Sequence, residues 1–333
     1  MKIIVDAMGG DHAPSEMVKG ACLAAKEFDI DVVLVGIAEE ILKCIEQLGY
    51  KELPSLVEVA NASEIITMED DPTTAVKGKK DSSMAVALKM LRDGQGDAVV
   101  SAGNTGALLT GSTLTVKRIK GIRRAAMAPI LPNKGSGVIL VDCGANVECT
   151  KEYMLQFAFM GYYYARDVLK KENPKVGLLN IGSEETKGTT LQRETYALLE
   201  EHREKINFIG NIEGRDVLMG EVDVVVTDGF TGNVLLKAVE GTAQFVASEM
   251  KKIFMKNMVS KLAAAMVKSG IDDFKSIFDV SETGGTALLG ISKPVIKAHG
   301  NSEAYAIRSA IKQAMQVTQS GIIDSIEHNM ATG

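Results

Sequence analysis

Short apolar runs rich in valine and isoleucine alternate with stretches of helical period along this chain, and this alternation restricts the fold more than any other feature. Such runs are typical of strands buried on both faces. The predicted strands are Lys2–Val5, Asp31–Val35, Asp97–Val100, Gly137–Val141, Lys175–Ile181, Ile206–Ile209, Val222–Thr227 and Val295–Ala298. The predicted helices are Ser15–Phe28, Glu39–Leu48, Met84–Leu91, Lys151–Leu169 and Thr190–Glu201, with a last helix capped by Ser302. The pattern predicts an α/β protein with a largely parallel sheet covered on both faces.

The segments that follow the predicted strands are rich in glycine and short polar residues. They are Asp6–Asp11, Ser101–Ala107, Asp142–Asn146, Asn180–Ser183, Asp228–Asn233, Gly284–Thr286 and His299–Ser302. One glycine after a strand is explained by a tight turn alone. In parallel sheets, however, ligands bind beyond the carboxyl ends of the strands. Seven such segments at one sheet edge therefore predict a shared cleft.

The segment SAGNTGA, Ser101–Ala107, has the pattern of an anion site. It lies between a buried strand and a predicted helix, where small residues let the backbone approach a ligand and free N–H groups point at it. It lacks the lysine of nucleotide-triphosphate loops and the glycine spacing of dinucleotide sites. The sequence therefore favours a smaller anion.

Four polar residues in the other segments or just beyond them are candidates for chemistry. Lys187 is able to place an ammonium against phosphate or a developing oxyanion, although a solvated lysine beside two glutamates is the alternative. Asp228 could orient a base and Asn233 could donate from a helix start, but helix capping alone explains such residues. His299 is a candidate hydrogen-bond donor or general acid.

Composition and charge exclude several classes of protein. With 37 basic and 43 acidic residues, the net charge of -6 gives no footprint for nucleic acid. The four cysteines lack zinc-ligand spacing and are expected to be reduced, and Cys143 follows Asp142, which raises rather than lowers a thiol pKa. No signal-peptide pattern and no apolar run of about 18 residues is present, so a cytoplasmic protein without a metal site is expected.

Residues 234–268 read as an amphipathic helical hairpin with a turn near Asn257. Lysines surround that turn, at Lys251, Lys252, Lys256, Lys261 and Lys268. A basic hairpin with apolar residues at its tip is able to rest on an anionic membrane surface. A dimer-packing or ordinary surface hairpin is the alternative.

These motifs together resemble the bacterial phosphate acyltransferases of phospholipid synthesis. The shared strings are DAMGGDHAP, SAGNTGA, DCGAN, NIGSEETKGT, DGFTGN, GGTALLG and PVIKAHGNS, in the order and spacing of that family and over essentially the whole chain. In one departure, many relatives carry Ala-Pro before the paired leucines of GGTALLG. Such enzymes transfer a fatty acyl group from acyl carrier protein to inorganic phosphate. Their acyl phosphate product is used by a membrane glycerol-3-phosphate acyltransferase.

The resemblance implies a three-layer α/β/α fold similar to isocitrate and isopropylmalate dehydrogenases. Residues 1–333 would form a single catalytic unit of two intertwined halves, built on one mixed sheet. It also implies a homodimer with no cofactor and direct attack of bound phosphate on the thioester. The implied phosphate-binding residues are Gly9, Gly10, Asp11, Ser101, Gly103, Asn104, Thr105 and Gly106. Lys187 would neutralise charge, with Asp228 supporting the site and Asn233 or His299 near the carbonyl.

The resemblance also favours peripheral contact of the hairpin with the inner face of the cell membrane. The expected contact residues are Phe254, Met258, Leu262 and Met266. Two other functions stay open, a phosphotransacetylase that uses short-chain acyl coenzyme A and a non-enzymatic scaffold at the membrane surface. A dehydrogenase is disfavoured, since the first strand lacks the nucleotide fingerprint.

Overall fold

The computed structural model describes residues 1–270 and 284–330, and its strands form two sheets. The larger sheet has seven strands in the order β3-β2-β1-β4-β12-β11-β5. They are β1 (Lys2–Asp6), β2 (Asp31–Gly36), β3 (Val57–Asn61), β4 (Ala98–Ser101), β5 (Ala126–Ala128), β11 (Thr286–Leu289) and β12 (Val295–Lys297). Only β11 runs antiparallel to its neighbours, β12 and β5. The carboxyl ends of β1, β4 and β12 therefore lie together at one edge.

The second sheet has five strands in the order β6-β7-β10-β8-β9. They are β6 (Ile130–Leu131), β7 (Val138–Val141), β8 (Val176–Asn180), β9 (Phe208–Glu213) and β10 (Val224–Val226). All its pairs are parallel except β6 with β7. The chain thus begins in the larger sheet, builds the smaller one, and returns for β11 and β12.

The α/β class is confirmed, but the expectation of one sheet is wrong. Residues 126–131 supply an edge strand to each sheet, and Pro129 separates the two strands. Proline has no N–H and cannot continue a strand ladder as a donor. Its carbonyl still accepts from the N–H of Leu140 at 3.0 Å, so this segment joins the two sheets.

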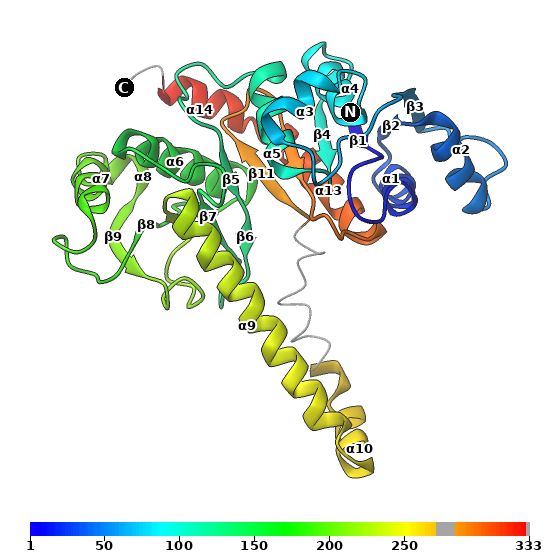
Figure 1. The fold of residues 1–333 in the computed structure, drawn as a ribbon. Coiled ribbons are helices and arrows are strands. Elements are labelled where there is room, and N and C mark those ends of the chain that lie inside the picture. Colours follow the sequence, from blue (N-terminus) through cyan, green and yellow to red (C-terminus); the bar gives the residue numbers. More distant parts are fainter. Residues whose placement is uncertain (271–283, 331–333) are drawn as a thin grey trace.

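Helices cover the sheets as the periodicity predicts (Figure 1). Their bounds are α1 (Ser15–Phe28), α2 (Ala38–Gln47), α3 (Pro72–Gly78), α4 (Ser83–Arg92), α5 (Thr105–Gly111), α6 (Lys151–Tyr163), α7 (Thr190–Glu200), α8 (Arg203–Ile206), α13 (Ala304–Gln319) and α14 (Ile322–Met330). Helix α1 packs along α13, and α6 packs on the second sheet against β7 and β10. One apolar core extends through both sheets, from Ile3 to Phe157 and Val224.

Three expectations about local structure need correction. Ser302 does not cap the helix that follows β12, because α13 begins at Ala304 and the N–H of Ala304 donates to the carboxylate of Glu16. Gly284 and Gly285 precede a strand, β11, and the residues before Gly284 lie outside the described part of the chain. The strand predicted at Ile206 begins at Phe208, since the preceding residues form α8.

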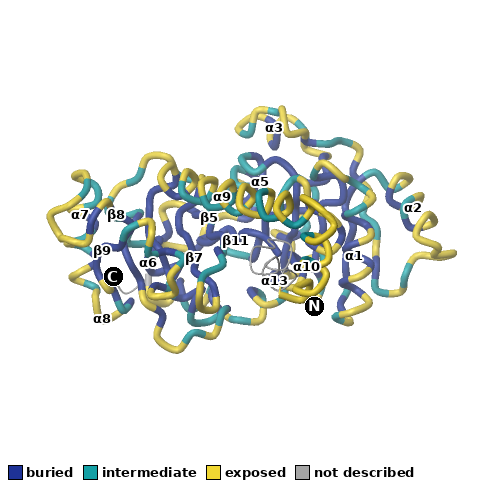
Figure 2. The backbone as a smooth tube through the Cα atoms, turned by 90° about the horizontal axis from the view of Figure 1, so that it is seen from below, coloured by how far each residue is buried: buried dark blue, intermediate teal, exposed yellow. Residues whose placement is uncertain are grey.

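Helices α9 (Gly229–Met255) and α10 (Met258–Met266) form the predicted hairpin. Figure 1 shows α9 running away from the body with α10 folded back at its far end. Figure 2 shows buried strands inside the body and an exposed hairpin. Of the α9 residues, only Gly229 and Gly232 are buried. No helix in the described part of the chain is long and apolar enough to cross a membrane.

Candidate functional site

Three buried polar residues stand side by side at the carboxyl edge of the larger sheet. In the strand register Ser101 is paired with Asp6 on one side and with Lys297 on the other. All three side chains are at least nine-tenths buried. Neighbouring strands lie about 4.8 Å apart, so these groups form one compact polar centre.

Asp6 and Ser101 fix the start of the SAGNTGA loop. The Ser101 hydroxyl donates to Asp6 Oδ2 at 2.6 Å and accepts from the N–H of Gly103 at 3.1 Å. Burial raises the pKa of Asp6, and the hydrogen bond from Ser101 opposes that shift. Because Ser101 has one hydroxyl proton and gives it to Asp6, it supports the loop rather than a ligand.

Glycines allow three loops to meet above this centre. A Cβ atom on Gly9 would stand 2.7 Å from both Asp6 Oδ2 and the Gly103 nitrogen. Gly10 has a φ of +110°, a conformation that favours glycine. The N–H of Asp11 donates to the carbonyl of Gly300 at 2.7 Å. The structure therefore brings together the loops after β1, β4 and β12.

Asn104 also serves the loop. It caps α5 by accepting from the N–H of Ala107, and its side-chain nitrogen donates to the carbonyls of residues 67, 68 and 70. Thr105 and Gly106 form the first turn of α5, where N–H groups have no partner within the helix. Among described residues, no hydrogen bond uses the N–H of Gly9, Gly10, Thr105 or Gly106. The predicted phosphate loops thus offer backbone donors.

Lys297 is the residue that sequence reasoning missed. Its ammonium donates to the carbonyl of Ala102 at 3.3 Å and to that of Ala298. Burial lowers its pKa to about 8, while the charges of Asp6 and Asp11 oppose that shift. Its position directly after the apolar run Pro294–Ile296 is the sequence signal that could have identified it. Such a run predicts a buried strand, and a lysine is almost never fully buried without a special role.

The second sheet carries a separate polar edge around Asp142. Its buried carboxylate accepts from the backbone N–H groups of Met127, Cys143 and Asn146 at 2.6 to 2.8 Å. The N–H of Gly229 donates to the carbonyl of Asn146 at 2.8 Å, which joins the loop after β7 to the start of α9. Burial raises the pKa of Asp142, although these N–H groups lower it.

Asp228 and Asn233 have different places at the start of α9. Asp228 is the N-cap, since its carboxylate accepts from the N–H and the hydroxyl of Thr231 at 2.8 and 2.7 Å. Asn233 is exposed, and its side chain lies 3.7 Å from the position that a Cβ on Gly144 would occupy. The cap holds the first turn of α9, so Asn233 faces the loop after β7.

Lys187 follows β8 in the second sheet and is exposed to solvent. Its ammonium lies 3.8 Å from Glu184 Oε1, and its carbonyl accepts from the side chain of Asn180 at 3.1 Å. The structure therefore does not bring Lys187 into the buried centre of the larger sheet.

Two charged residues of helix α9 affect the pKa values of groups at the polar edges of both sheets. Burial lowers the pKa of His299, with smaller effects from Glu240, Lys297 and Lys237. Lys237 and Glu240, both on α9, also act on Cys143 after β7. The base of α9 therefore lies near the polar edges of both sheets.

Cys143 is unsuited to nucleophilic catalysis. The side chain is buried, and burial together with the charge of Asp142 raises its pKa to about 12. A thiolate is the nucleophilic form, and it is scarce at neutral pH when the pKa is that high. The direction of this pKa shift agrees with the expectation from Asp142, although burial is the larger cause.

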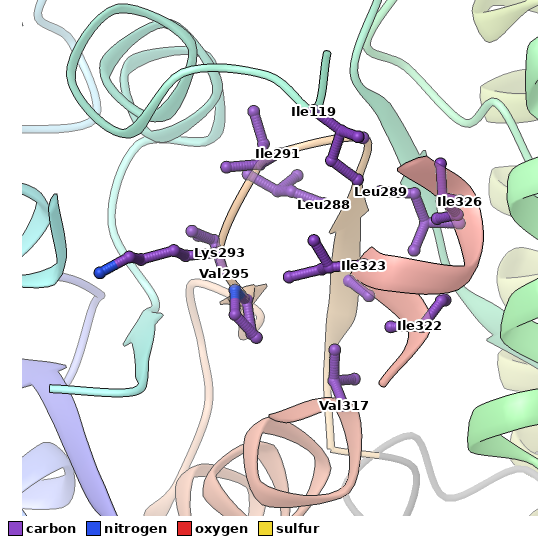
Figure 3. Close-up of a pocket in the computed structure, with 13 residues that line it drawn as sticks. Ile119, Leu288, Leu289, Ile291, Lys293, Val295, Val317, Ile322, Ile323 and Ile326 are labelled. Atoms are coloured by element: carbon purple, nitrogen blue, oxygen red, sulfur yellow. The ribbon is translucent and has the colours of Figure 1, made fainter. Parts of the chain in front are cut away.

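A small apolar pocket lies between β11, α13 and α14 (Figure 3). Its lining includes Leu289, Lys293 and Ile326, and Val295 places it at the amino end of β12. Its volume of about 20 Å³ admits one water-sized group. This pocket is therefore too small for an acyl chain and lies away from the loops that follow β1, β4 and β12.

The fold is that of phosphotransacylases. A phosphotransacetylase from Streptococcus pyogenes superposes with a TM-score of 0.64 at 16% identity, covering 95% of this chain and 94% of that chain. A 4-hydroxythreonine-4-phosphate dehydrogenase from Klebsiella pneumoniae gives a TM-score of 0.55 at 14% identity, covering 96% and 98%. These similarities concern architecture alone.

Sequence comparison defines the family. The family model described as "Fatty acid synthesis protein" matches residues 1–325. A phosphate acyltransferase of Thermoanaerobacterium thermosaccharolyticum is 46% identical over 330 residues, covering 99% of this chain and 97% of that protein. Another, from Fusobacterium nucleatum, is 47% identical over 333 residues and covers 99% of both. The chain belongs to the phosphate acyltransferase family and is an acyltransferase.

Proposed function

We propose that this acyltransferase moves a long-chain fatty acyl group from acyl carrier protein to inorganic phosphate, which gives an acyl phosphate for phospholipid synthesis. The observation that carries the proposal is the meeting of three loops around Asp6, Ser101 and Lys297, with unpaired N–H groups among the described residues. Backbone N–H groups in such loops suit a small anion.

Bound phosphate attacks the thioester directly in this mechanism. A phosphate oxygen forms a bond to the carbonyl carbon, the carbon–sulfur bond breaks, and the proton of hydrogen phosphate goes to the departing thiolate. Asn233 or His299 donates to the developing oxyanion. Burial lowers the pKa of His299, which favours a neutral imidazole that still donates one hydrogen bond. The high pKa of Cys143 argues against an acyl-cysteine intermediate.

The acyl donor is tested by supplying the purified protein with phosphate and either long-chain acyl carrier protein or short-chain acyl coenzyme A. We expect faster phosphate-dependent thiol release from the carrier protein. Preference for short-chain acyl coenzyme A would favour a phosphotransacetylase. No phosphate-dependent loss of either thioester would favour a scaffold without activity.

Lys187 is proposed to neutralise charge on the thioester side of the site, after β8. Lys187→Ala is expected to lower kcat by roughly 10², the effect of removing one group that stabilises transition-state charge. Steady-state kinetics with acyl carrier protein would measure it, with thermal unfolding as the check on folding. Wild-type kinetics would make Lys187 a surface residue that pairs with Glu184.

Helix α9 and helix α10 are proposed to meet a second copy of the chain and an anionic membrane surface. Phe245 and Ile253 on α9 are each 64% exposed, and Met258, Leu262 and Met266 on α10 are also exposed. Phe254 is half-buried. Exposed apolar surface of this extent is typical of protein or membrane contacts. Membrane contact would place the enzyme at the inner face of the cell membrane, beside the glycerol-3-phosphate acyltransferase that uses its product.

Leu262→Glu is expected to reduce flotation of the protein with vesicles that contain anionic lipid, because it puts a negative charge on the apolar face of α10. Lys251→Glu removes a basic charge without changing an apolar residue of α10. Comparison of the two variants therefore separates the loss of apolar contact from the loss of basic charge. Turnover with soluble acyl carrier protein should stay at the wild-type level in both variants. Unchanged flotation of Leu262→Glu would remove the hairpin from membrane binding.

A further inference from the structure

The loop SAGNTGA in the proposed phosphate site offers neutral donors and no positive charge. Ser101 gives its hydroxyl proton to Asp6, and Asn104 gives its amide hydrogens to backbone carbonyls. What is left in SAGNTGA is backbone N–H groups and the hydroxyl of Thr105. Lys187 is exposed beyond a strand of the other sheet. Inorganic phosphate at neutral pH is a mixture of its monoanion and dianion, and its binding is strengthened by a charge-assisted hydrogen bond.

Lys297 has the position to supply that charge. Its ammonium reaches the carbonyl of Ala102, the residue between Ser101 and Gly103. A Cβ on Gly10 would stand 3.0 Å from Ala102 Cβ and 3.0 Å from the carbonyl oxygen of Gly300. The ammonium therefore lies where the loops after β1, β4 and β12 converge.

The ammonium also has a donor to spare. A lysine ammonium carries three N–H bonds. In the described part of the chain, two hydrogen bonds are formed, to the carbonyls of Ala102 and Ala298. A buried charge is costly unless it is paired. The nearby charges of Asp6 and Asp11 offset part of that cost, but in the described part of the chain neither carboxylate accepts a hydrogen bond from the ammonium. The third N–H is therefore left for an anion bound between the loops.

Resting on the proposed function, we propose that Lys297 is the cation that binds inorganic phosphate in this enzyme, through its third N–H. The backbone N–H groups of the loops after β1 and β4 hold the other phosphate oxygens. Lys187 is then free to act at the thioester. Lys297 thus neutralises the charge of phosphate, a role for which the sequence had suggested Lys187.

The charged groups around Lys297 set its response to pH. Asp6 on β1, Asp11 beyond β1 and His299 beyond β12 face it, and Ser101 lies beside it on β4. With a pKa of about 8, Lys297 is charged below that pH and loses its charge above it. The KM for phosphate should therefore rise as the pH passes through about 8.

The test compares Lys297→Met with Lys293→Met, a matched change on the same segment. Lys293 donates to the carbonyl of Leu91 at 2.7 Å and lies at the opposite end of β12. Lys297→Met is expected to lower kcat/KM for phosphate by roughly 10- to 100-fold, with the KM for acyl carrier protein unchanged. Lys293→Met should keep wild-type values for both substrates. Lys297→Arg should remove the rise in phosphate KM above pH 8, because arginine stays charged.

A second readout needs no acyl donor. Inorganic phosphate should raise the Tm of Lys293→Met as much as that of the wild type, and at the same concentration it should raise the Tm of Lys297→Met by less. An equal Tm shift and an unchanged phosphate KM in Lys297→Met would overturn the assignment. If wild-type protein shows the Tm shift but no transfer from carrier protein to phosphate, the proposed function fails while the binding role of Lys297 stands.

Discussion

Gly9→Ala is expected to lower kcat/KM for phosphate by roughly 10² or more while the protein stays folded. The added methyl group would stand 2.7 Å from Asp6 Oδ2 and 2.7 Å from the nitrogen of Gly103, and both of those groups are buried and hydrogen-bonded. Neither is the free end of a flexible side chain, so the loop after β1 must move away from SAGNTGA. A misplacement of about 1 Å at a reacting centre is able to cost 10²-fold in rate.

Phosphate-dependent release of carrier-protein thiol measures this effect. Gly78→Ala is the matched control, because a Cβ on Gly78 meets nothing within 4 Å. It should keep wild-type kinetics. If Gly9→Ala also kept wild-type kinetics, close packing of these two loops would not matter for phosphate use.

Gly232→Ala is expected to have the largest effect on stability, a loss of about 3 kcal/mol in the free energy of unfolding. Its methyl group would overlap the carbonyl oxygen of Asp142 and stand 2.8 Å from Thr227 Cγ2. The carboxylate of Asp142 accepts from three backbone N–H groups, and these bonds resist movement of the residue and of its carbonyl. The start of α9 must therefore move away from the loop after β7.

Urea unfolding measures this loss, with Gly241→Ala as the control in the same helix. A Cβ on Gly241 meets nothing within 4 Å, so alanine there should stabilise by about 1 kcal/mol through helix propensity. Equal free energies of unfolding for Gly232→Ala and wild type would mean that α9 is not anchored on the second sheet as described.

The sequence was sufficient for the α/β class because buried parallel strands are continuous Val/Ile runs. Strands β5 and β6 escaped prediction, since Ala126–Ala128 and Ile130–Leu131 are too short to show a pattern. The place of β5 is set by pairing with β11, which is remote in sequence, whereas β6 pairs with β7, the next strand along the chain. The division into two sheets at Pro129 depends on that pairing.

The candidate site was predictable as a set of loops but not as a set of roles. Glycine after a buried strand identified the loops around Gly9 and Gly103. The hydrogen bond from Ser101 to Asp6 crosses between strands 95 residues apart in sequence, so only the fold reveals that this serine is committed. Lys297 was overlooked because a lysine is normally exposed to solvent. Its burial follows from the place of β12 between β4 and β11, which only the fold reveals.

Direct attack of bound phosphate on the acyl carrier protein thioester is open to one decisive measurement. Purified protein is incubated with long-chain acyl carrier protein in the presence and in the absence of inorganic phosphate. Free carrier thiol, acyl phosphate and protein-bound acyl groups are then quantified. We predict equal amounts of thiol and acyl phosphate, formed only with phosphate, and no acyl group on the protein. Thiol release without phosphate, with an acyl group left on the protein, would contradict the account.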